Sequence, residues 1–322
     1  MDSFVFALNA TLPIFLLILL GWFLRRVGIL SEGFTNGANK YVFQCALPFS
    51  LFRSMSHMDF RAEFDPGFCL FCFGVTTAMF FGIWGLSWLL MKDRALVGAF
   101  SQASVRASAA ILGVAMAENI YGSAGLVPMM IMASVPFFNA YSVVILTFSP
   151  HVDEQGHLLP PAPEENLWKK TLLNVAKNPI IIAILLGIPF SVFSIPIPHI
   201  AETLISQVAG TATTIALLVV GASLSGLDVR KQWKPTLAAT LIKLFLLPAV
   251  FLPLAAFFGF RNSAMIAILI MVGGPTTVSC FVMAKQMGGD APLTAQVVAL
   301  STLVSSVSIT FWVFLLRWFS LI

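Results

Sequence analysis

The segment 271–290, MVGGPTTVSCFVMAKQMGGD, interrupts a long apolar stretch with Gly-Gly-Pro and two threonines. A chain that crosses lipid has no water to satisfy freed backbone groups, so an interruption is tolerated only beside protein or a water-filled cavity. Gly274 and Pro275 favour a fresh helix start, whose free N–H groups and positive dipole end suit an anion. The alternative is a proline kink in an ordinary packed helix. The first interpretation predicts an anion site near the middle of the membrane.

Arg106 is the ionisable side chain with the sharpest implication, because it lies about eleven residues into an apolar stretch, too deep to snorkel comfortably. A buried guanidinium can hold a substrate carboxylate or close a binding site. It can equally donate hydrogen bonds to the carbonyls of unwound backbone, and the sequence does not separate these roles. For Lys243, about eight residues into another apolar stretch, packing or snorkelling is the favoured interpretation and a supporting charge is the alternative.

These residues belong to segments that are expected to cross a membrane as helices. Apolar residues make up 58% of the chain, charged residues 10%, and the mean hydropathy is +0.93. A soluble domain carries far fewer apolar residues, so the predicted fold class is an all-α membrane protein. About 20 apolar residues span the hydrocarbon layer, and ten stretches are predicted to do so: 4–24, 39–55, 67–90, 95–119, 124–148, 178–194, 201–225, 235–258, 263–287 and 293–318.

The distribution of lysine and arginine predicts the orientation, because these residues accumulate in cytoplasmic loops. With the N-terminus outside, four basic residues face outward: Arg53, Arg61, Arg261 and Arg317. Twelve then face the cytoplasm: Arg25, Arg26, Lys40, Lys92, Arg94, Lys169, Lys170, Lys177, Arg230, Lys231, Lys234 and Lys285. Both termini are therefore expected outside the cell membrane. The first span is expected to remain as a helix, because its basic pair follows it rather than precedes it.

The two halves of the chain resemble each other at a nearly constant offset. Pro13–Gly21 (PIFLLILLG) matches Pro179–Gly187 (PIIIAILLG) at an offset of 166, and Ile120–Ala124 matches Met287–Ala291 at 167. Five spans per half make the second half enter the membrane inverted, an arrangement typical of transporters with broken helices. The predicted domains are the first repeat, a cytoplasmic loop with a short interfacial helix, and the inverted repeat: 1–148, 149–177 and 178–322.

All fourteen acidic residues fall outside the interiors of the predicted spans, with Glu118 the nearest to an exception. The pattern therefore lacks the buried carboxylates that usually bind sodium or relay protons. A sodium-coupled organic anion symporter stays the alternative within transport, because sodium sites can also be built from carbonyls and hydroxyls. The alternative from another class is a non-transporting membrane receptor or scaffold.

Enzymatic, metal-binding and nucleic-acid-binding functions have little support. Gly221–Gly226 (GASLSG) has the outline of an intramembrane serine protease motif, but no histidine lies in a span to act as its base. Cys69 and Cys72 share a helix face without further ligands, and the loop 151–157 is expected to be a solvated linker rather than a metal site. The sequence has no basic stripe with interleaved aromatic residues. We therefore expect no enzymatic activity, cofactor, bound metal or nucleic-acid partner.

Motifs spread over nearly the whole chain resemble a known family. They are LPIFLLILLGWFLRRVGIL, NKYVFQCALPFSLF, ILGVAMAENIYG, KLFLLP, GGPTTVSCFVMAKQMGGD and STLVSSVSITFW. Together they resemble the auxin efflux carrier family, which includes plant auxin exporters and bacterial malate or malonate carriers, and the chain is similar to a bacterial member. The resemblance also brings Asn139 into the site and places Ser108 where the family usually has Asn.

This resemblance implies ten helices with a division of labour. The first, second, sixth and seventh spans would form a scaffold and dimer surface. The third to fifth and eighth to tenth spans would form a moving domain, whose crossover lies in the spans 95–119 and 263–287. The bile-acid symporters and sodium-proton antiporters have a similar architecture.

The predicted function is secondary transport of a small organic anion, such as a carboxylate, by elevator-like alternating access of a homodimer in the lipid bilayer. The repeat offset places Pro275 opposite Ala109, so both broken spans are expected to contribute to one site. The residues predicted to bind substrate are Arg106, Ser108, Ala109, Asn139, Pro275, Thr276, Thr277 and Ser279, with Lys243 as the candidate supporting charge.

Overall fold

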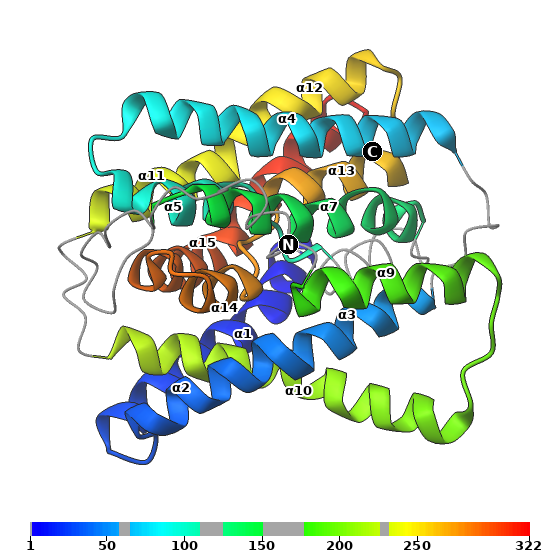
Figure 1. Ribbon diagram of the computed structural model, residues 1–322. Coiled ribbons are helices and arrows are strands. Elements are labelled where there is room, and N and C mark those ends of the chain that lie inside the picture. The colour runs from blue at the N-terminus through cyan, green and yellow to red at the C-terminus, as the bar shows by residue number, and fades with distance from the viewer. Residues whose placement is uncertain (1, 58–64, 110–124, 151–176, 226–231) are drawn as a thin grey trace.

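The computed structural model describes residues 2–57, 65–109, 125–150, 177–225 and 232–322, and the regular elements of these residues are all helices (Figure 1). In chain order they are α1 (Asp2–Arg26), α2 (Glu32–Tyr41), η1 (Val42–Ala46), α3 (Leu47–Ser56), α4 (Pro66–Leu90), η2 (Arg94–Leu96), α5 (Val97–Val105), α7 (Val127–Phe148), α9 (Pro179–Val192), α10 (His199–Leu224), α11 (Trp233–Leu241), η3 (Ile242–Leu246), α12 (Leu247–Phe257), α13 (Ser263–Gly273), α14 (Ser279–Gln286) and α15 (Ala291–Trp318).

Five helical stretches among the described residues are long and apolar enough to cross a membrane: Pro66–Leu90, Val127–Phe148, His199–Leu224, Trp233–Phe257 and Ala291–Trp318. The stretch Trp233–Phe257 consists of α11, η3 and α12 together. The helices α9 and α13 are shorter and also apolar. The described residues therefore form an all-α membrane protein, as predicted. The count of ten spans and the inverted repeat stay predictions. The predicted continuation of the fourth span over 110–119, the repeat match at 120–124 and the predicted interfacial helix lie outside the described residues.

The second helix begins earlier than predicted. It runs without a break through α2, η1 and α3, from Glu32 rather than from residue 39. Ser31 caps it, because the Ser31 hydroxyl accepts the N–H of Phe34 at 3.1 Å, and the Thr35 hydroxyl donates to the Ser31 carbonyl at 2.9 Å. The first two turns are polar, so hydropathy carried no signal for them.

Three other helix starts follow one local rule. Asp65, Asn178 and Asp290 precede α4, α9 and α15, and each side chain accepts a backbone N–H two or three residues later at 2.8–3.1 Å. A proline stands in the first turn of each helix, where its missing N–H leaves no helical bond unmade. Short polar caps therefore set the ends of these apolar helices.

Two helices widen into a π-helical turn just before a proline. The turn η1 precedes Pro48, and η3 precedes Pro248. Proline has no N–H for the carbonyl four residues earlier, so the helical ladder is interrupted there. In η3 the freed Leu244 carbonyl accepts the indole N–H of Trp312 at 2.8 Å instead. The same turn carries Lys243, and π-helical turns frequently occur at functional sites.

Buried apolar side chains form two clusters. The first joins α4, α5, α7, α11, α12, α13 and α15, and Phe68 and Phe80 are among its members. The second joins α1, η1, α3, α9 and α10 with parts of α7, α14 and α15, and it includes Ile18 and Leu217. In Figure 1 the helices α4, α5, α7, α11, α12 and α13 lie above α2, α3, α9 and α10, with α14 and α15 between them. We call these groups the first and the second core.

The second core contains a close helix crossing. A side chain at Gly21 of α1 would overlap the Leu218 carbonyl of α10, and one at Gly221 of α10 would overlap the Ile18 carbonyl of α1. The two backbones therefore touch at a pair of glycines, each facing the other helix. Small residues permit such approach between membrane helices, whose association depends on close packing.

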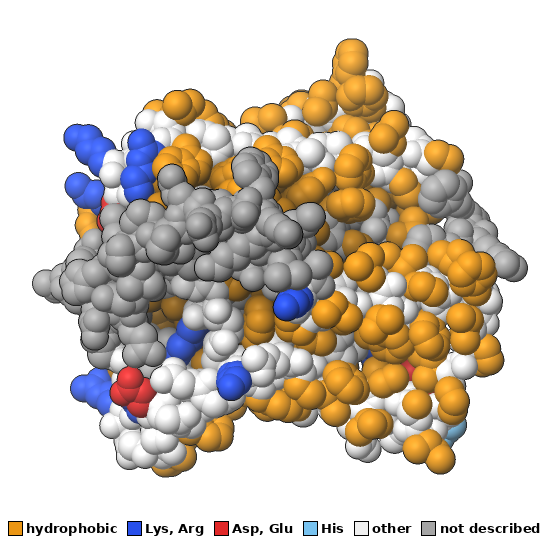
Figure 2. Space-filling model, in the orientation of Figure 1, with side chains coloured by type: hydrophobic (Ala, Val, Ile, Leu, Met, Phe, Trp, Pro, Cys, Tyr) orange, Lys and Arg blue, Asp and Glu red, His pale blue; other side chains and the backbone are white. Residues whose placement is uncertain are grey.

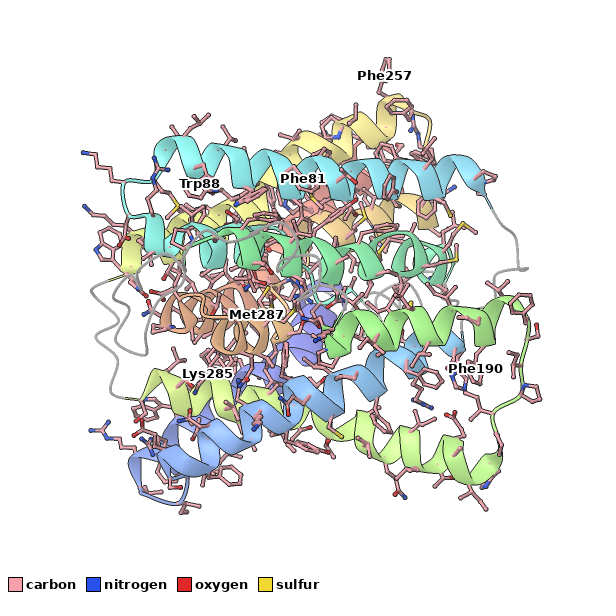
Figure 3. All side chains as sticks on the ribbon, in the orientation of Figure 1. Phe81, Trp88, Phe190, Phe257, Lys285 and Met287 are labelled. Atoms are coloured by element: carbon pink, nitrogen blue, oxygen red, sulfur yellow. The ribbon has the colours of Figure 1, made fainter. Side chains whose placement is uncertain are left out.

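Apolar side chains cover much of the face seen in Figure 2, outside the residues drawn in grey. Large side chains are widely exposed, including Leu89 at 80% and Phe257 at 85%, and Phe257 projects from the end of α12 (Figure 3). Lysine and arginine side chains gather at one end of the visible face, where α4 leads into α5 and where α11 begins (Figure 2). An apolar belt with basic residues at one end suits a protein that lies in a bilayer.

Candidate functional site

Two helices are broken, and their extended segments cross. The helix α5 ends at Val105, Arg106 is extended, residues 107–108 are not helical, and Ala109, which is helical, is the last described residue before 125. The helix α13 ends at Gly273, and α14 begins at Ser279 after a non-helical stretch. The Ser108 N–H donates to the Pro275 carbonyl at 2.9 Å, which ties one break to the other. The interruption predicted at Gly-Gly-Pro is therefore a true break rather than a proline kink.

Polar contacts satisfy the backbone at this crossing. The Thr276 hydroxyl donates to the Ala103 carbonyl at 2.8 Å, and the Thr276 N–H donates to the Ser301 hydroxyl at 3.0 Å. The Gln102 amide donates to the Cys280 carbonyl at 3.1 Å. Irregular backbone in a membrane protein needs such partners, because each unsatisfied group costs several kcal/mol there. Thr276 thus holds the two chain segments together.

Arg106 lies at the crossing with its guanidinium inside the protein, and only 2% of the residue is exposed. One terminal nitrogen donates to the Asn139 side-chain oxygen at 2.8 Å and to the Ser279 hydroxyl at 2.7 Å, and the other contacts the Met283 sulfur at 2.7 Å. The Arg106 Nε has no hydrogen-bond partner among the described residues. No carboxylate of those residues forms an ion pair with Arg106. Among the described residues, the groups that contact its guanidinium are therefore neutral.

A cavity of about 170 Å³ lies beside this arginine. All eight residues predicted to bind substrate line it: Arg106, Ser108, Ala109, Asn139, Pro275, Thr276, Thr277 and Ser279. Thr277 and Ser279 are partly exposed there, with their hydroxyls 3.3 Å apart. The structure therefore brings the predicted set together at one place.

The cavity also has a second wall that the sequence did not reveal. It comes from α3 and α10, which belong to the second core: Leu47, Ser50, Leu51, Ala212, Thr213 and Ala216. Ser50 and Thr213 are polar residues within apolar spans, and this was the available signal. Since the remaining lining comes mainly from helices of the first core, the cavity lies between the two cores.

Lys243 is fully buried and does not line this cavity. Its ammonium donates to the carbonyls of Val105 at 2.9 Å, Met271 at 3.1 Å and Val272 at 3.0 Å. Snorkelling is therefore excluded, since the side chain turns inward and uses all three of its donors on backbone, whereas the packing role favoured from the sequence agrees with these contacts. The carbonyls come from the last turns of both broken helices, which no local pattern around Lys243 shows.

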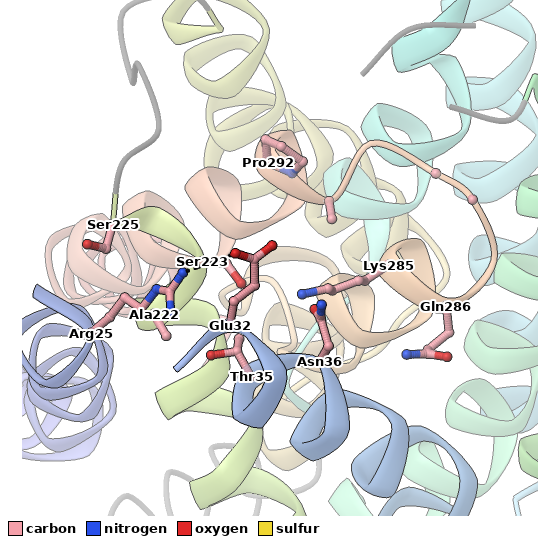
Figure 4. A pocket seen from close by; sticks show the side chains of 13 residues that line it. Arg25, Glu32, Thr35, Asn36, Ala222, Ser223, Ser225, Lys285, Gln286 and Pro292 are labelled. Carbon is pink, nitrogen blue, oxygen red and sulfur yellow. Dashed lines mark ion pairs between the residues drawn. The ribbon is translucent and has the colours of Figure 1, made fainter. Parts of the chain in front are cut away.

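A second, larger cavity of about 450 Å³ lies near the end of α1 (Figure 4). Arg25 forms an ion pair with Glu32 there at 3.6 Å, and Lys285 of α14 points toward the same space from the opposite wall (Figure 4). Residues of α1, α2 and α10 face residues of α14 and α15 across it. This cavity contains none of the residues predicted to bind substrate, so its position does not coincide with the predicted site.

Metal ligands do not gather in the described part of the chain, where no group of three His, Cys, Asp or Glu side chains could hold an ion. The loop 151–157, weighed above as a weak metal site, lies outside the described residues.

An all-helical membrane protein with two broken helices that cross beside a buried basic cavity has the architecture of a membrane transport protein. The sequence matches the family described as "Membrane transport protein" over residues 6–313. The chain belongs to this family, the auxin efflux carrier family, as its motifs indicated.

Two relatives are similar over nearly their full length. An "Uncharacterized transporter" of Methanothermobacter thermautotrophicus is 21% identical over 96% of this chain and 98% of its own. The "Uncharacterized transporter YfdV" of Escherichia coli is 25% identical over 97% of this chain and 98% of its own. These proteins are transporters by name, and the family is one of transporters rather than enzymes.

Proposed function

We propose that the protein is a secondary transporter that moves a small organic anion, such as a carboxylate, and that the anion binds Arg106 in the cavity at the crossing. The observation that supports this proposal most strongly is the buried Arg106 guanidinium. Among the described residues it has no carboxylate partner, and its Nε forms no hydrogen bond. A buried charge left without a counter-charge is unfavourable, and an incoming carboxylate would supply both the charge and the acceptors.

The size of the cavity supports a small substrate. Its volume of about 170 Å³ is below the range of roughly 300–1,000 Å³ typical of sites for drug-sized ligands. The hydroxyls of Ser108, Thr277 and Ser279 and the N-terminal end of α14 add hydrogen-bond donors and a favourable dipole. A carboxylate with a few carbons fits this combination.

The two cores support an elevator-like movement. In this proposal the predicted scaffold spans, 1, 2, 6 and 7, correspond to α1, α2 with α3, α9 and α10, which form most of the second core. The remaining helices carry the crossing and move past them. The cavity lies between the groups, so a displacement of one group would change which side of the membrane it faces. A homodimer formed through the scaffold would leave the crossing free to move.

The larger cavity is assigned to the cytoplasmic side in this proposal, with both termini outside. It lies beside Arg25 and Lys285, two of the twelve basic residues that define the cytoplasmic side. Single cysteines introduced at His57 should then react with an impermeant reagent from outside intact cells, and cysteines at Ser223 only after the membrane is opened. Reversed labelling would invert the orientation. Disulfide crosslinks between two copies of α5 or of α14 would contradict the dimer.

The proposed transport is electrogenic and independent of sodium. The predicted spans carry no interior carboxylate for a coupling cation, so the substrate anion carries the charge. Each net negative charge that leaves the cell gains roughly 2.3 kcal/mol per 100 mV of inside-negative potential. Export of the anion then needs no ion gradient.

The deciding experiment measures uptake of radiolabelled monocarboxylates and dicarboxylates into proteoliposomes with a voltage set by valinomycin. Wild-type flux should follow voltage without sodium, and Arg106→Gln should reduce it at least about 100-fold, because a charge-assisted pair is lost. The control is Arg261→Gln, which changes an arginine that only donates to nearby backbone carbonyls at the surface. Flux that needs sodium and ignores voltage would favour the symporter. Binding without flux would favour a receptor or scaffold.

A further inference from the structure

The Lys243 ammonium lies in a ring of backbone carbonyls of the kind that binds a free monovalent cation. It lies 2.9–3.1 Å from three backbone carbonyl oxygens, and the residue is 0% exposed. Carbonyl oxygens at the ends of broken helices are the ligands with which transporters bind monovalent cations, and carbonyl rings bind potassium in channels. Here the charge is attached to the chain itself.

The position of the three carbonyls explains why a cation is needed there. Val105 is the last residue of α5, and Met271 and Val272 are in the last turn of α13. Each helix ends with unpaired carbonyls and a partial negative charge, and the crossing brings both ends to one point. Without a positive charge the two ends would repel each other and leave buried acceptors unsatisfied.

The local structure around Lys243 holds it in this place. The residue lies in the π-helical turn η3, which Pro248 follows, and the neighbouring Leu244 carbonyl is fixed by the indole of Trp312. The Lys243 ammonium donates three hydrogen bonds, which is the full capacity of the group. Lys243 thus has no donor left for a substrate, whereas Arg106 has one.

We propose that Lys243 is a tethered cation that fills a monovalent-cation site between the two broken helices, so that the crossing is held without a bound ion. Removal of the side chain exposes this site to free sodium or potassium. The role of Lys243 in the structure does not depend on what is transported. Only the statement that the tethered charge makes transport independent of a cation rests on the proposed function.

The first arm of the test measures thermal unfolding of the purified protein in lithium, sodium, potassium or choline chloride at equal ionic strength. Lys243→Ala removes the ammonium and leaves space, so its melting temperature should fall in choline and rise by at least about 3 °C, saturably, in sodium or potassium. Lys243→Met fills much of the space with an apolar chain and should be destabilised in all four salts. The melting temperature of wild type should not differ among the four salts, and neither should that of Lys285→Ala.

Each outcome decides the proposal. A sodium- or potassium-specific rise in the wild-type melting temperature would show an open cation site and contradict it. The same holds if Lys243→Ala responds to no small cation, or does not fold in cells, where both cations are present. Equal recovery of Lys243→Met would show a general salt effect and contradict it as well.

The second arm measures anion flux of Lys243→Ala in proteoliposomes with and without sodium and potassium. We expect flux only with a small cation that also restores stability, whereas wild-type flux needs none. If wild type transports no anion, the proposed function fails while the thermal arm still decides the role of Lys243. Cation-independent flux of Lys243→Ala would reject the tethered cation even if the proposed function holds.

Discussion

The protein contains two helix crossings that are built on opposite principles. At the crossing of α1 and α10, Gly21 and Gly221 bring two intact backbones into contact among apolar residues such as Ile18 and Leu217. At the crossing of α5 and α13, both helices are broken, and hydrogen bonds from polar and charged side chains hold the two non-helical backbone segments together. The first crossing is packed through glycines among apolar side chains, and the second is held by hydrogen bonds.

The difference follows from where the backbone hydrogen bonds go. An intact helix satisfies its own N–H and C=O groups, so it can pack through shape alone, and the closest packing needs glycine. A broken helix exposes donors at one end and acceptors at the other. Thr276 and Lys243 donate hydrogen bonds to backbone carbonyls at the broken helices. The N-terminal end of α14, which carries the free N–H donors, lies at the cavity that Arg106 lines. The same break therefore creates both the need for support and the site.

The largest effect is expected from a variant that disrupts the glycine crossing. Gly221→Leu would drive a side chain into the Ile18 backbone of α1, and overpacking against backbone should cost at least about 3 kcal/mol or prevent folding. An added Cβ at Gly210 of the same helix meets no atom within 4 Å, so Gly210→Leu should fold normally. Size-exclusion profiles and melting temperatures of both variants check this. Equal stability of the two would mean that α1 and α10 do not pack through glycine.

The second-largest effect is expected from a variant that adds an internal ion pair to the polar crossing. Asn139→Asp would place a carboxylate next to Arg106, whose guanidinium already lies 2.8 Å from the Asn139 oxygen. This internal carboxylate competes with a substrate carboxylate, so we expect flux at least about 10-fold below that of Asn139→Leu, without loss of stability. Paired flux and melting measurements test it. Equal flux in the two variants would remove Arg106 from substrate binding.

A smaller effect tests how the broken backbone is supported. Thr276→Val deletes the hydroxyl that donates to the Ala103 carbonyl and leaves a buried acceptor, at a cost of about 1–3 kcal/mol in unfolding free energy. Thr310→Val removes a hydroxyl that bonds only within its own helix, to Ser306, and should cost less than about 0.5 kcal/mol. Denaturation of both variants compares them. A Thr276 variant as stable as the Thr310 variant would show that this bond does not support the crossing.

The smallest effect separates the two walls of the cavity. Ser108 holds the crossing through its N–H, so Ser108→Ala keeps that bond and loses only a hydroxyl donor. We expect KM to rise about 2- to 10-fold, with an unchanged melting temperature. Thr213→Val, on the α10 wall, should leave KM within about 2-fold if the substrate binds to the crossing rather than to the scaffold. The opposite ranking would place the substrate on α10.

Most of the site could be predicted from the sequence because its signals are local. A Gly-Gly-Pro break and a deep arginine are exceptions to the apolar pattern, and each exception is visible without knowing the fold. The eight predicted residues then line one cavity, partly because the family motifs placed Asn139 beside the broken spans. The membrane class follows from composition alone.

Only the tertiary structure decided what the polar groups do. The carbonyls that receive the Lys243 ammonium lie 138, 28 and 29 residues away along the chain, and nothing near Lys243 in the sequence announces them. The sequence predicts that Thr276 binds substrate, but in the structure its hydroxyl donates to a carbonyl 173 residues away. A sequence shows where hydrogen-bonding groups are displaced into an apolar segment. Which partner satisfies each one depends on distances between distant segments, which exist only in the folded chain.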